Sequence, residues 1–326
     1  MRSLSGVKPT GTLHIGNYFG AIRQFVQLQN QYDCFYFIAD YHALNTHPDP
    51  AVLTAQTWDI VTAYLAMGID PERSTVFLQS QVPEVAELTL LLFNHIPKGL
   101  LERAHAYKDA MNKGIQVNCG LFIYPALMAA DILLYDSNVV PVGQDQKQHL
   151  EITRDVALAF NHHYGEDLFV VPEPLILESV AVVPGTDGRK MSKSYGNVID
   201  PFASEKELKK QVMSIVTDST PLEAPKNPDT CNVFALYKLV ASSEEVQAMR
   251  HNYLAGHYGF GHAKLALFEK LRDTFAPMRA RREELLRDRS LVENALARGA
   301  ARARETAVTK IRRLKKAMGL IGNIYQ

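Results

Sequence analysis

The chain is poor in cysteine, and its few thiols lie far apart. Cys34, Cys119 and Cys231 are the three cysteines among 326 residues. Neither a Cys-x-x-Cys pair nor a Cys/His cluster at ligand spacing occurs, so we predict no protein-bound structural metal. Thiols this sparse also argue against a disulfide-stapled secreted fold and favour a reducing compartment.

Long hydrophobic runs and an excess of either charge are missing as well. Segment 1–6 has no apolar signal core. The most apolar run, 121–135, is interrupted by Pro125 and Asp131 and is too short to span a bilayer. Lys+Arg and Asp+Glu both number 35, so a nucleic-acid partner would need a local basic face. These absences predict a soluble, cytoplasmic protein.

The first half alternates between apolar runs of strand length and helical periodicity. Hydrophobic residues make up 47% of the chain, enough for a packed core. The continuous apolar run at 35–39 suits a parallel strand covered on both faces. Segment 75–78 is expected to be another buried strand, and segment 4–7 a short strand that ends in the turn at 9–11. Helical spacing lies between them. The pattern predicts an α/β fold, a Rossmann-like doubly wound parallel sheet, over residues 1–188. Ligands of such sheets bind at the carboxyl ends of strands near a topological switch point.

The second half has a helical pattern. Helices are expected at about 232–241, 243–255, 261–286 and 290–318. Residues 189–326 are therefore predicted to form an all-α C-terminal domain.

A turn of small residues follows the first predicted strand. It reads Pro9-Thr10-Gly11-Thr12-Leu13-His14-Ile15-Gly16-Asn17. Small residues let backbone N–H groups approach a phosphate, and the following helix offers its positive N-terminus. A lone histidine in such a loop is more often structural. The Thr-Gly turn before His14 and the Gly-Asn pair after it favour a phosphate-binding role.

A lysine-rich loop follows the Pro/Gly turn at 184–188. This lysine loop, residues 189–196, reads Arg189-Lys190-Met191-Ser192-Lys193-Ser194-Tyr195-Gly196. Its two lysines are compact cations that suit a polyphosphate. Taken alone, such a loop is usually a solvated basic turn.

The two stretches together resemble the paired motifs of class I aminoacyl-tRNA synthetases. The first, at 14–17, has the His-Ile-Gly-Asn form rather than the more common His-Ile-Gly-His, and the second is 190–194. The resemblance implies that His14, Asn17, Lys190 and Lys193 are catalytic. It implies that ATP is bound by Lys8, Thr10, Gly16, Asn17, Gly143, Asp145, Lys190, Met191, Ser192, Lys193 and Ser194.

An isolated carboxylate lies on an apolar helical segment in the middle of the chain. Tyr124, Met128, Asp131 and Tyr135 share one face of the predicted helix. A carboxylate there is costly unless it is paired or faces a ligand. From the residues alone, an N-capping or salt-bridged Asp131 is as good an interpretation as a functional one.

The same segment resembles the side-chain pocket of the tryptophanyl and tyrosyl members of the family, where an Asp accepts a hydrogen bond from the substrate ring. The tyrosyl pattern has Gln three positions before that Asp, whereas this chain has Met128, which suits an indole. Segment 139–149 is close to the tryptophanyl Val-Pro-Val-Gly-Glu-Asp-Gln-Lys-Gln-His. The implied tryptophan contacts are Leu4, Gly6, His42, Tyr124, Met128, Asp131, Val140, Val142 and Gln146.

Three positions depart from the family pattern. Lys8 and Tyr41 stand where Gln is usual, and Gln144 replaces the Glu of Gly-Glu-Asp. Lys8 can bind a carboxylate or a phosphate in place of the glutamine. We expect a changed contact to the substrate's α-groups rather than a loss of activity.

The last predicted helix is strongly basic. Residues 298–316 contain eight Lys and Arg, with Glu305 as the sole acid. Such a row is either a solvated face or a surface that tracks phosphates. The resemblance favours the second, with Arg302, Arg312, Arg313 and Lys316 as candidate tRNA contacts in a domain that meets the anticodon.

The resemblance also implies the reaction and the partners. ATP, carrying Mg²⁺, would activate L-tryptophan, and the acyl group would pass to the 2′-hydroxyl of tRNA(Trp). The family is homodimeric, with the helical segment around 84–135 forming the pocket and the dimer interface. Three alternatives stay open: a tyrosine-specific enzyme, a nucleotidylyl transferase that never handles tRNA, and a paralogue with a regulatory or tRNA-independent role.

Overall fold

A computed structural model describes residues 1–143, 147–165, 167–176 and 183–321. One parallel sheet of five strands has the order β3-β2-β1-β4-β5. The strands are β1 (Arg2–Val7), β2 (Asp33–Ile38), β3 (Thr75–Leu78), β4 (Val139–Val142) and β5 (Glu173–Ile176). The chain runs outward from β1 to β3 and returns to add β4 on the other side of β1. The switch point of this doubly wound sheet therefore lies between β1 and β4.

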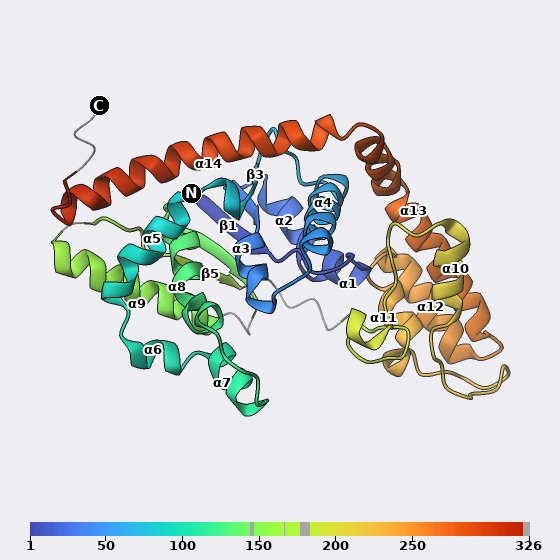
Figure 1. Cartoon of the computed structure of the whole chain (residues 1–326). Coiled ribbons are helices and arrows are strands. Elements are labelled where there is room, and N and C mark those ends of the chain that lie inside the picture. Colours follow the sequence, from blue (N-terminus) through green and yellow to red (C-terminus); the bar gives the residue numbers. More distant parts are fainter. Residues whose placement is uncertain (144–146, 166, 177–182, 322–326) are drawn as a thin grey trace.

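Helices cover both faces of the sheet and build a separate body beyond it (Figure 1). Those of the sheet half are α1 (Ile15–Asn17), α2 (Arg23–Leu28), α3 (Asp40–Ala43), α4 (Pro50–Ala66), α5 (Glu84–Leu92), α6 (Lys98–Glu102), α7 (His105–Asn112), α8 (Cys119–Leu133) and α9 (Lys147–Tyr164). The second half has α10 (Glu205–Met213), α11 (Asn232–Tyr237), α12 (Ser243–Ala255), α13 (Phe260–Arg287) and α14 (Ser290–Ala317). The predicted fold class is confirmed.

Strand β2 shows why its sequence is continuously apolar. Phe35 and Phe37 pack into the core under α5, α8 and α9, whereas Tyr36 and Ile38 pack into the core formed with α2 and α4. Successive residues of a strand point to opposite faces, so a sheet covered on both faces needs apolar residues at every position. β3 was likewise predicted as a buried strand, whereas β1, which contains Ser3 and Ser5, was predicted as the short strand before the turn at 9–11.

A third hydrophobic core joins the helical body, formed by α10 to α13, to the first motif at residues 14–17. Ile15 and Phe19 pack in one cluster with Met191 and with buried residues of α10, α11 and α13, such as Leu208. The loop after β1 and the lysine loop are therefore held by the same body of packed side chains, although 175 positions separate Gly16 from Met191.

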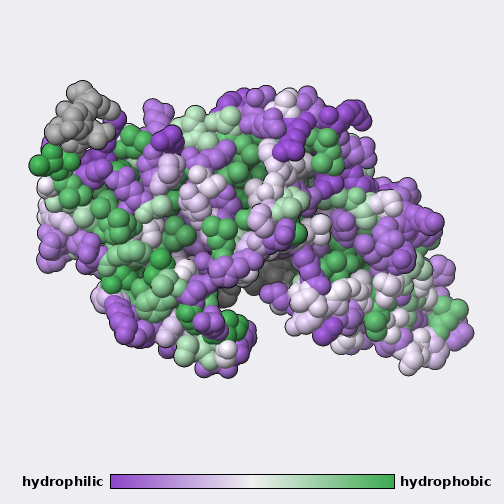
Figure 2. Space-filling model, viewed as in Figure 1, coloured by the Kyte–Doolittle hydropathy of each residue, from purple (hydrophilic) through white to green (hydrophobic). Residues whose placement is uncertain are grey.

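The last helix returns to the sheet. α14 lies along β3, the strand at one edge, and its outer surface is mainly hydrophilic (Figures 1 and 2). Gly299 meets the backbone of Val76 so closely that a Cβ there would lie 1.8 Å from the Val76 carbonyl oxygen. Among the described helices, none is both long and apolar enough to cross a bilayer.

Replacing Gly299 with alanine should therefore destabilise the protein. The added methyl group has no space, so α14 must shift away from β3, at a cost of about 2–3 kcal/mol in the free energy of unfolding. Urea denaturation measures this value. Gly261→Ala in α13 is the matched control, because a Cβ there meets nothing within 4 Å. An equal stability of the two variants would contradict the close approach.

Candidate active site

A cavity of about 320 Å³ opens at the carboxyl ends of β1 and β4, at the switch point. This volume lies in the range of small-molecule sites. Eight of the predicted tryptophan contacts line it: Leu4, Gly6, His42, Tyr124, Met128, Asp131, Val140 and Val142. Lys8 and Gly143, predicted for ATP, line it too. Asp145, Gln146 and the departure at Gln144 lie outside the described residues.

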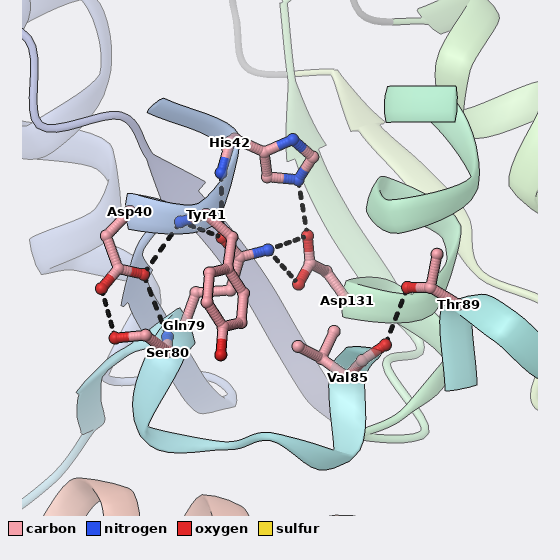
Figure 3. Close-up of polar contacts among 8 residues, drawn as sticks. All are labelled: Asp40, Tyr41, His42, Gln79, Ser80, Val85, Thr89 and Asp131. Carbon is pink, nitrogen blue, oxygen red and sulfur yellow. Dashed lines mark hydrogen bonds and ion pairs between the residues drawn. The ribbon is translucent and has the colours of Figure 1, made fainter. Parts of the chain in front are cut away.

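Asp131 is buried in this cavity and held by two side chains from other elements (Figure 3). His42 Nε2 lies 2.8 Å from Asp131 Oδ2. Gln79 Nε2 donates to Oδ1 at 2.8 Å and to Oδ2 at 3.0 Å. Asp131 lies inside α8 rather than at its start, so the N-capping interpretation was wrong. An ionised carboxylate offers about four acceptor positions, which leaves room for one further donor.

Gln79 is the residue that the sequence interpretation missed. It directly follows β3 and is 1% exposed. Its Oε1 accepts from the backbone N–H groups of Tyr41 and His42, at 3.1 and 3.4 Å. These bonds fix the orientation of the amide, so that its Nε2 must face Asp131. Its place at the carboxyl end of a buried parallel strand was the available signal.

Burial and hydrogen bonding act in opposite directions on Asp131. Burial raises the pKa of the carboxyl group, and the bonds from His42 and Gln79 counter that effect. The Tyr41 departure leaves this network intact, because Tyr41 contributes its backbone N–H. The floor of the cavity is thus a hydrogen-bond acceptor among apolar walls.

Tyr124 and Lys8 also line the cavity. The Tyr124 hydroxyl lies 2.9 Å from Nε2 and 3.0 Å from Nδ1 of the buried His149. Lys8 Nζ lies 5.6 Å from the centre of the Tyr124 ring. Burial lowers the pKa of Lys8. The departure at Lys8 therefore places an amine in the cavity, where it can meet an anionic group of a ligand.

His14 and Asn17 form the turn that opens α1. Asn17 Oδ1 accepts the backbone N–H of His14 at 3.0 Å. His14 is 8% exposed, and its Nδ1 has no hydrogen-bond partner among the described residues. Burial, aided by the charge of Lys193, lowers the pKa of His14 to about 4. Its imidazole is therefore neutral near pH 7 and acts as a hydrogen-bonding group rather than as a cation.

This depressed pKa predicts a pH dependence of stability. The unfolded chain takes up a proton at His14 below about pH 6.5, whereas the folded chain does so only near pH 4. The folded state should thus lose about 2 kcal/mol between pH 6.5 and pH 5 through this group. Urea denaturation of wild type and of His14→Gln tests this, since the variant should lose less stability over that range. Equal slopes would show that His14 ionises normally.

The lysine loop touches the first motif directly. Lys193 Nζ donates to the carbonyl oxygen of Thr10 at 2.6 Å. Gly11 has φ +63°, and a Cβ there would lie 2.8 Å from Lys193 Nζ. A Cβ at Gly16 would lie 2.8 Å from His14 Nδ1, so the second glycine is needed for close approach as well.

The other residues of the lysine loop have distinct positions. Met191 is buried in the third core, so its described contacts are those of an anchor. Ser192 and Ser194 bond to each other through their hydroxyls at 2.9 Å. Lys190 and Lys193 are exposed. The structure thus places Lys193 beside Thr10 of the first motif and packs Met191 in the same core as Ile15.

The basic row on α14 meets acids of the sheet half. Its ion pairs are Arg298–Glu72, Arg302–Asp33, Arg304–Glu84, Lys310–Asp136 and Lys315–Glu87. Arg313 donates to the carbonyl oxygen of Asp167 at 3.0 Å. Of the four predicted tRNA contacts, Arg302 and Arg313 thus have protein partners. The basic surface left for a nucleic acid is smaller than the sequence suggests.

Comparison with known proteins agrees with this geometry. The family described as tRNA synthetases class I (W and Y) matches residues 1–276. The tryptophan–tRNA ligase of Fusobacterium nucleatum subsp. nucleatum is 56% identical, over 99% of this chain and 99% of its own. That of Rhodopirellula baltica is 51% identical, over 98% of this chain and 100% of its own.

A solved structure gives the same result in three dimensions. Tryptophanyl-tRNA synthetase from Campylobacter jejuni, complexed with ADP and tryptophan, has a TM-score of 0.92 and 48% identity to this chain. The match covers 98% of this chain and 100% of that one. The chain therefore belongs to the class I tRNA synthetases of the tryptophan and tyrosine type.

Proposed function

We propose that this protein is a tryptophan–tRNA ligase. It activates L-tryptophan with ATP to tryptophanyl-adenylate, releases pyrophosphate, and transfers the acyl group to the 2′-hydroxyl of the terminal adenosine of tRNA(Trp). The observation that carries the proposal is the buried Asp131, fixed by His42 and Gln79 in a mainly apolar cavity at the switch point of the sheet. The tryptophan–tRNA ligases at 56% and 51% identity support it.

Selection of tryptophan rests on the floor of the cavity. Asp131 accepts the indole N–H in the acceptor position left by His42 and Gln79, while Met128, Val140 and Val142 pack against the ring. Indole only donates a hydrogen bond, whereas a phenol also accepts one. Because Met128 cannot donate to a phenol oxygen, the wall suits indole better than tyrosine.

Activation needs no protein nucleophile. An oxygen of the tryptophan carboxylate forms a bond to the α-phosphorus of ATP, and the bond from that phosphorus to the bridging oxygen of the β-phosphate breaks. Catalysis is then positioning and charge stabilisation. His14 and Asn17 hydrogen-bond the phosphates, and Lys190 and Lys193 neutralise the leaving pyrophosphate. Lys8, which lines the cavity, contacts the substrate carboxylate or the α-phosphate.

Partners follow from the same reaction. Mg²⁺ enters bound to ATP, because phosphate oxygens are ligands that it prefers. Residues 1–188 form the catalytic domain, and residues 189–326 comprise the lysine loop and the helical domain that contacts tRNA. Arg312 and Lys316 are the predicted contacts on α14 with neither an ion pair nor a side-chain hydrogen bond among the described residues, unlike Arg302 and Arg313. A cytoplasmic homodimer with its interface around residues 84–135 completes the proposal.

One pair of measurements tests the proposal. ATP–pyrophosphate exchange is measured with each amino acid in turn, and charging of purified tRNA(Trp) and tRNA(Tyr) follows. We expect exchange with tryptophan and charging of tRNA(Trp). Exchange with tyrosine would establish the alternative specificity, exchange without charging a tRNA-independent transferase, and absence of exchange a regulatory paralogue.

A further inference from the structure

Asn197 lies directly after the lysine loop and is 2% exposed. Its Oδ1 accepts the backbone N–H of Ser192 at 2.8 Å. Its Nδ2 donates to Asp187 Oδ1 at 2.6 Å and to the carbonyl oxygen of Lys190 at 3.2 Å. The Asn197 side chain therefore connects the turn at 184–188 to Lys190 and Ser192, the residues on either side of Met191.

The turn itself is closed around this amide. Pro184 pairs with Lys190 in an antiparallel bridge, and Gly185 N–H donates to the Arg189 carbonyl at 2.7 Å. The Asn197 carbonyl oxygen accepts from Thr186 N–H at 2.9 Å. Gly185 is required here, because a Cβ would lie 2.2 Å from Asn197 Nδ2. Residues 184–192 thus form a compact base, and 193–196 project from it exposed.

This arrangement determines where the two lysines can reach. The backbone of Lys190 is fixed by the amide Nδ2 and that of Ser192 by Oδ1, so Lys193 leaves the base at the next residue in a set direction. Met191, buried between the two fixed points, anchors the base to the core that also contains Ile15. The Asn197 amide therefore sets the direction of both lysine side chains through the backbone of the loop, without contacting either ammonium group.

We propose that Asn197 is the positioning residue of the lysine loop, holding Lys190 and Lys193 in the geometry that meets the polyphosphate of ATP. The proposal rests on the proposed function. Only an amide supplies both the acceptor for Ser192 and the donor for Asp187 and Lys190. The Asn197 bond is also the largest cause that lowers the pKa of Asp187, so the Asp187 carboxylate is ionised and needs that donor.

Asn197→Asp is the direct test. It keeps an acceptor for Ser192 but turns an oxygen toward the Asp187 carboxylate and the Lys190 carbonyl, which forces the base apart. Tryptophan-dependent ATP–pyrophosphate exchange should lose roughly 10- to 100-fold in kcat. Tryptophan affinity, measured without ATP, should stay within about twofold, because the cavity lies on other elements. Asn227→Asp, an exposed amide of the helical body, is the matched control and should leave exchange unchanged.

A second readout separates positioning from general damage. Transfer to tRNA from chemically synthesised tryptophanyl-adenylate involves no pyrophosphate, so Asn197→Asp should retain it nearly in full. The double variant Asp187→Asn/Asn197→Asp swaps the two side chains and so restores a donor–acceptor pair between them. It should recover part of the kcat of pyrophosphate exchange. If Asn197→Asp does not fold, Asp187→Asn alone carries the test and should lower kcat roughly threefold or more.

The outcomes are distinguishable. Equal losses of pyrophosphate exchange, tryptophan affinity and transfer to tRNA in Asn197→Asp would overturn the positioning role. A double variant that recovers no kcat would overturn it too. Wild-type exchange rates in Asn197→Asp would do the same. Absence of tryptophan-dependent exchange in the wild type would instead refute the proposed function.

Discussion

Lys193→Ala should lower the rate of tryptophanyl-adenylate formation by a factor that corresponds to about 2–4 kcal/mol of transition-state stabilisation. Lys193 is exposed on a short loop, yet its ammonium group reaches the carbonyl oxygen of Thr10 in the first motif. In the proposed mechanism this ammonium group neutralises the leaving pyrophosphate. Its charge acts on the phosphates, so tryptophan binding should be nearly unchanged. Pyrophosphate exchange gives the first quantity, and equilibrium binding of tryptophan gives the second.

The control for this variant is Lys206→Ala. Lys206 is an exposed lysine of α10 in the same helical body, so its loss changes the net charge without touching the loop. Its exchange rate should equal that of the wild type. An unchanged exchange rate in Lys193→Ala would remove the lysine loop from the mechanism.

Asp131→Asn should weaken both the binding and the selection of tryptophan. An amide at residue 131 can accept with one atom only, and its NH₂ group faces the donors of His42 or Gln79. The indole N–H then loses its acceptor, at a cost of about 2–4 kcal/mol in kcat/KM for tryptophan. Exchange measured with Trp, Phe and Tyr gives the discrimination ratios, which should fall because the buried groups no longer reject the wrong ring.

Asp109→Asn controls for the loss of a carboxylate. Asp109 lies in α7, the helix before the one that carries Asp131. It pairs with Lys113 on the surface, and its side chain is 61% exposed. This variant should keep wild-type discrimination. If Asp131→Asn also kept it, Asp131 would serve stability alone, as the partner of His42 and Gln79.

Local sequence patterns were sufficient to predict three of the five strands. β2 and β3 were predicted from their apolar residues, which pack on both faces of the sheet. β1 was predicted as the short strand that ends in the turn at 9–11. β4 and β5 were not predicted as strands, and both contain a proline, Pro141 and Pro174. Pro141 lies beyond the pairing of β4 with β1, which is limited to Ser3 and Val139, whereas the pairing of β4 with β5 continues through Pro141 and Leu175.

Partners that are distant in sequence were not predictable in the same way. The sequence could place Asp131 on an apolar helix face, but not Gln79, 52 positions away, against it. It could mark Lys193 as a cation, but not its contact with Thr10. The sequence also overestimated the free basic surface of α14. The acids that pair with it, such as Glu84 and Glu87, come from α5, far away in sequence.

The path of α14 has a consequence for the way this chain avoids self-association. β3 is one of the two edge strands of the sheet, and an open edge with unpaired backbone groups is a template for pairing with other chains. Gly299 brings α14 against the backbone of Val76, so this helix covers the edge. Because α14 is synthesised long after β3, the edge stays open until α14 docks, and its docking then protects the sheet against aggregation.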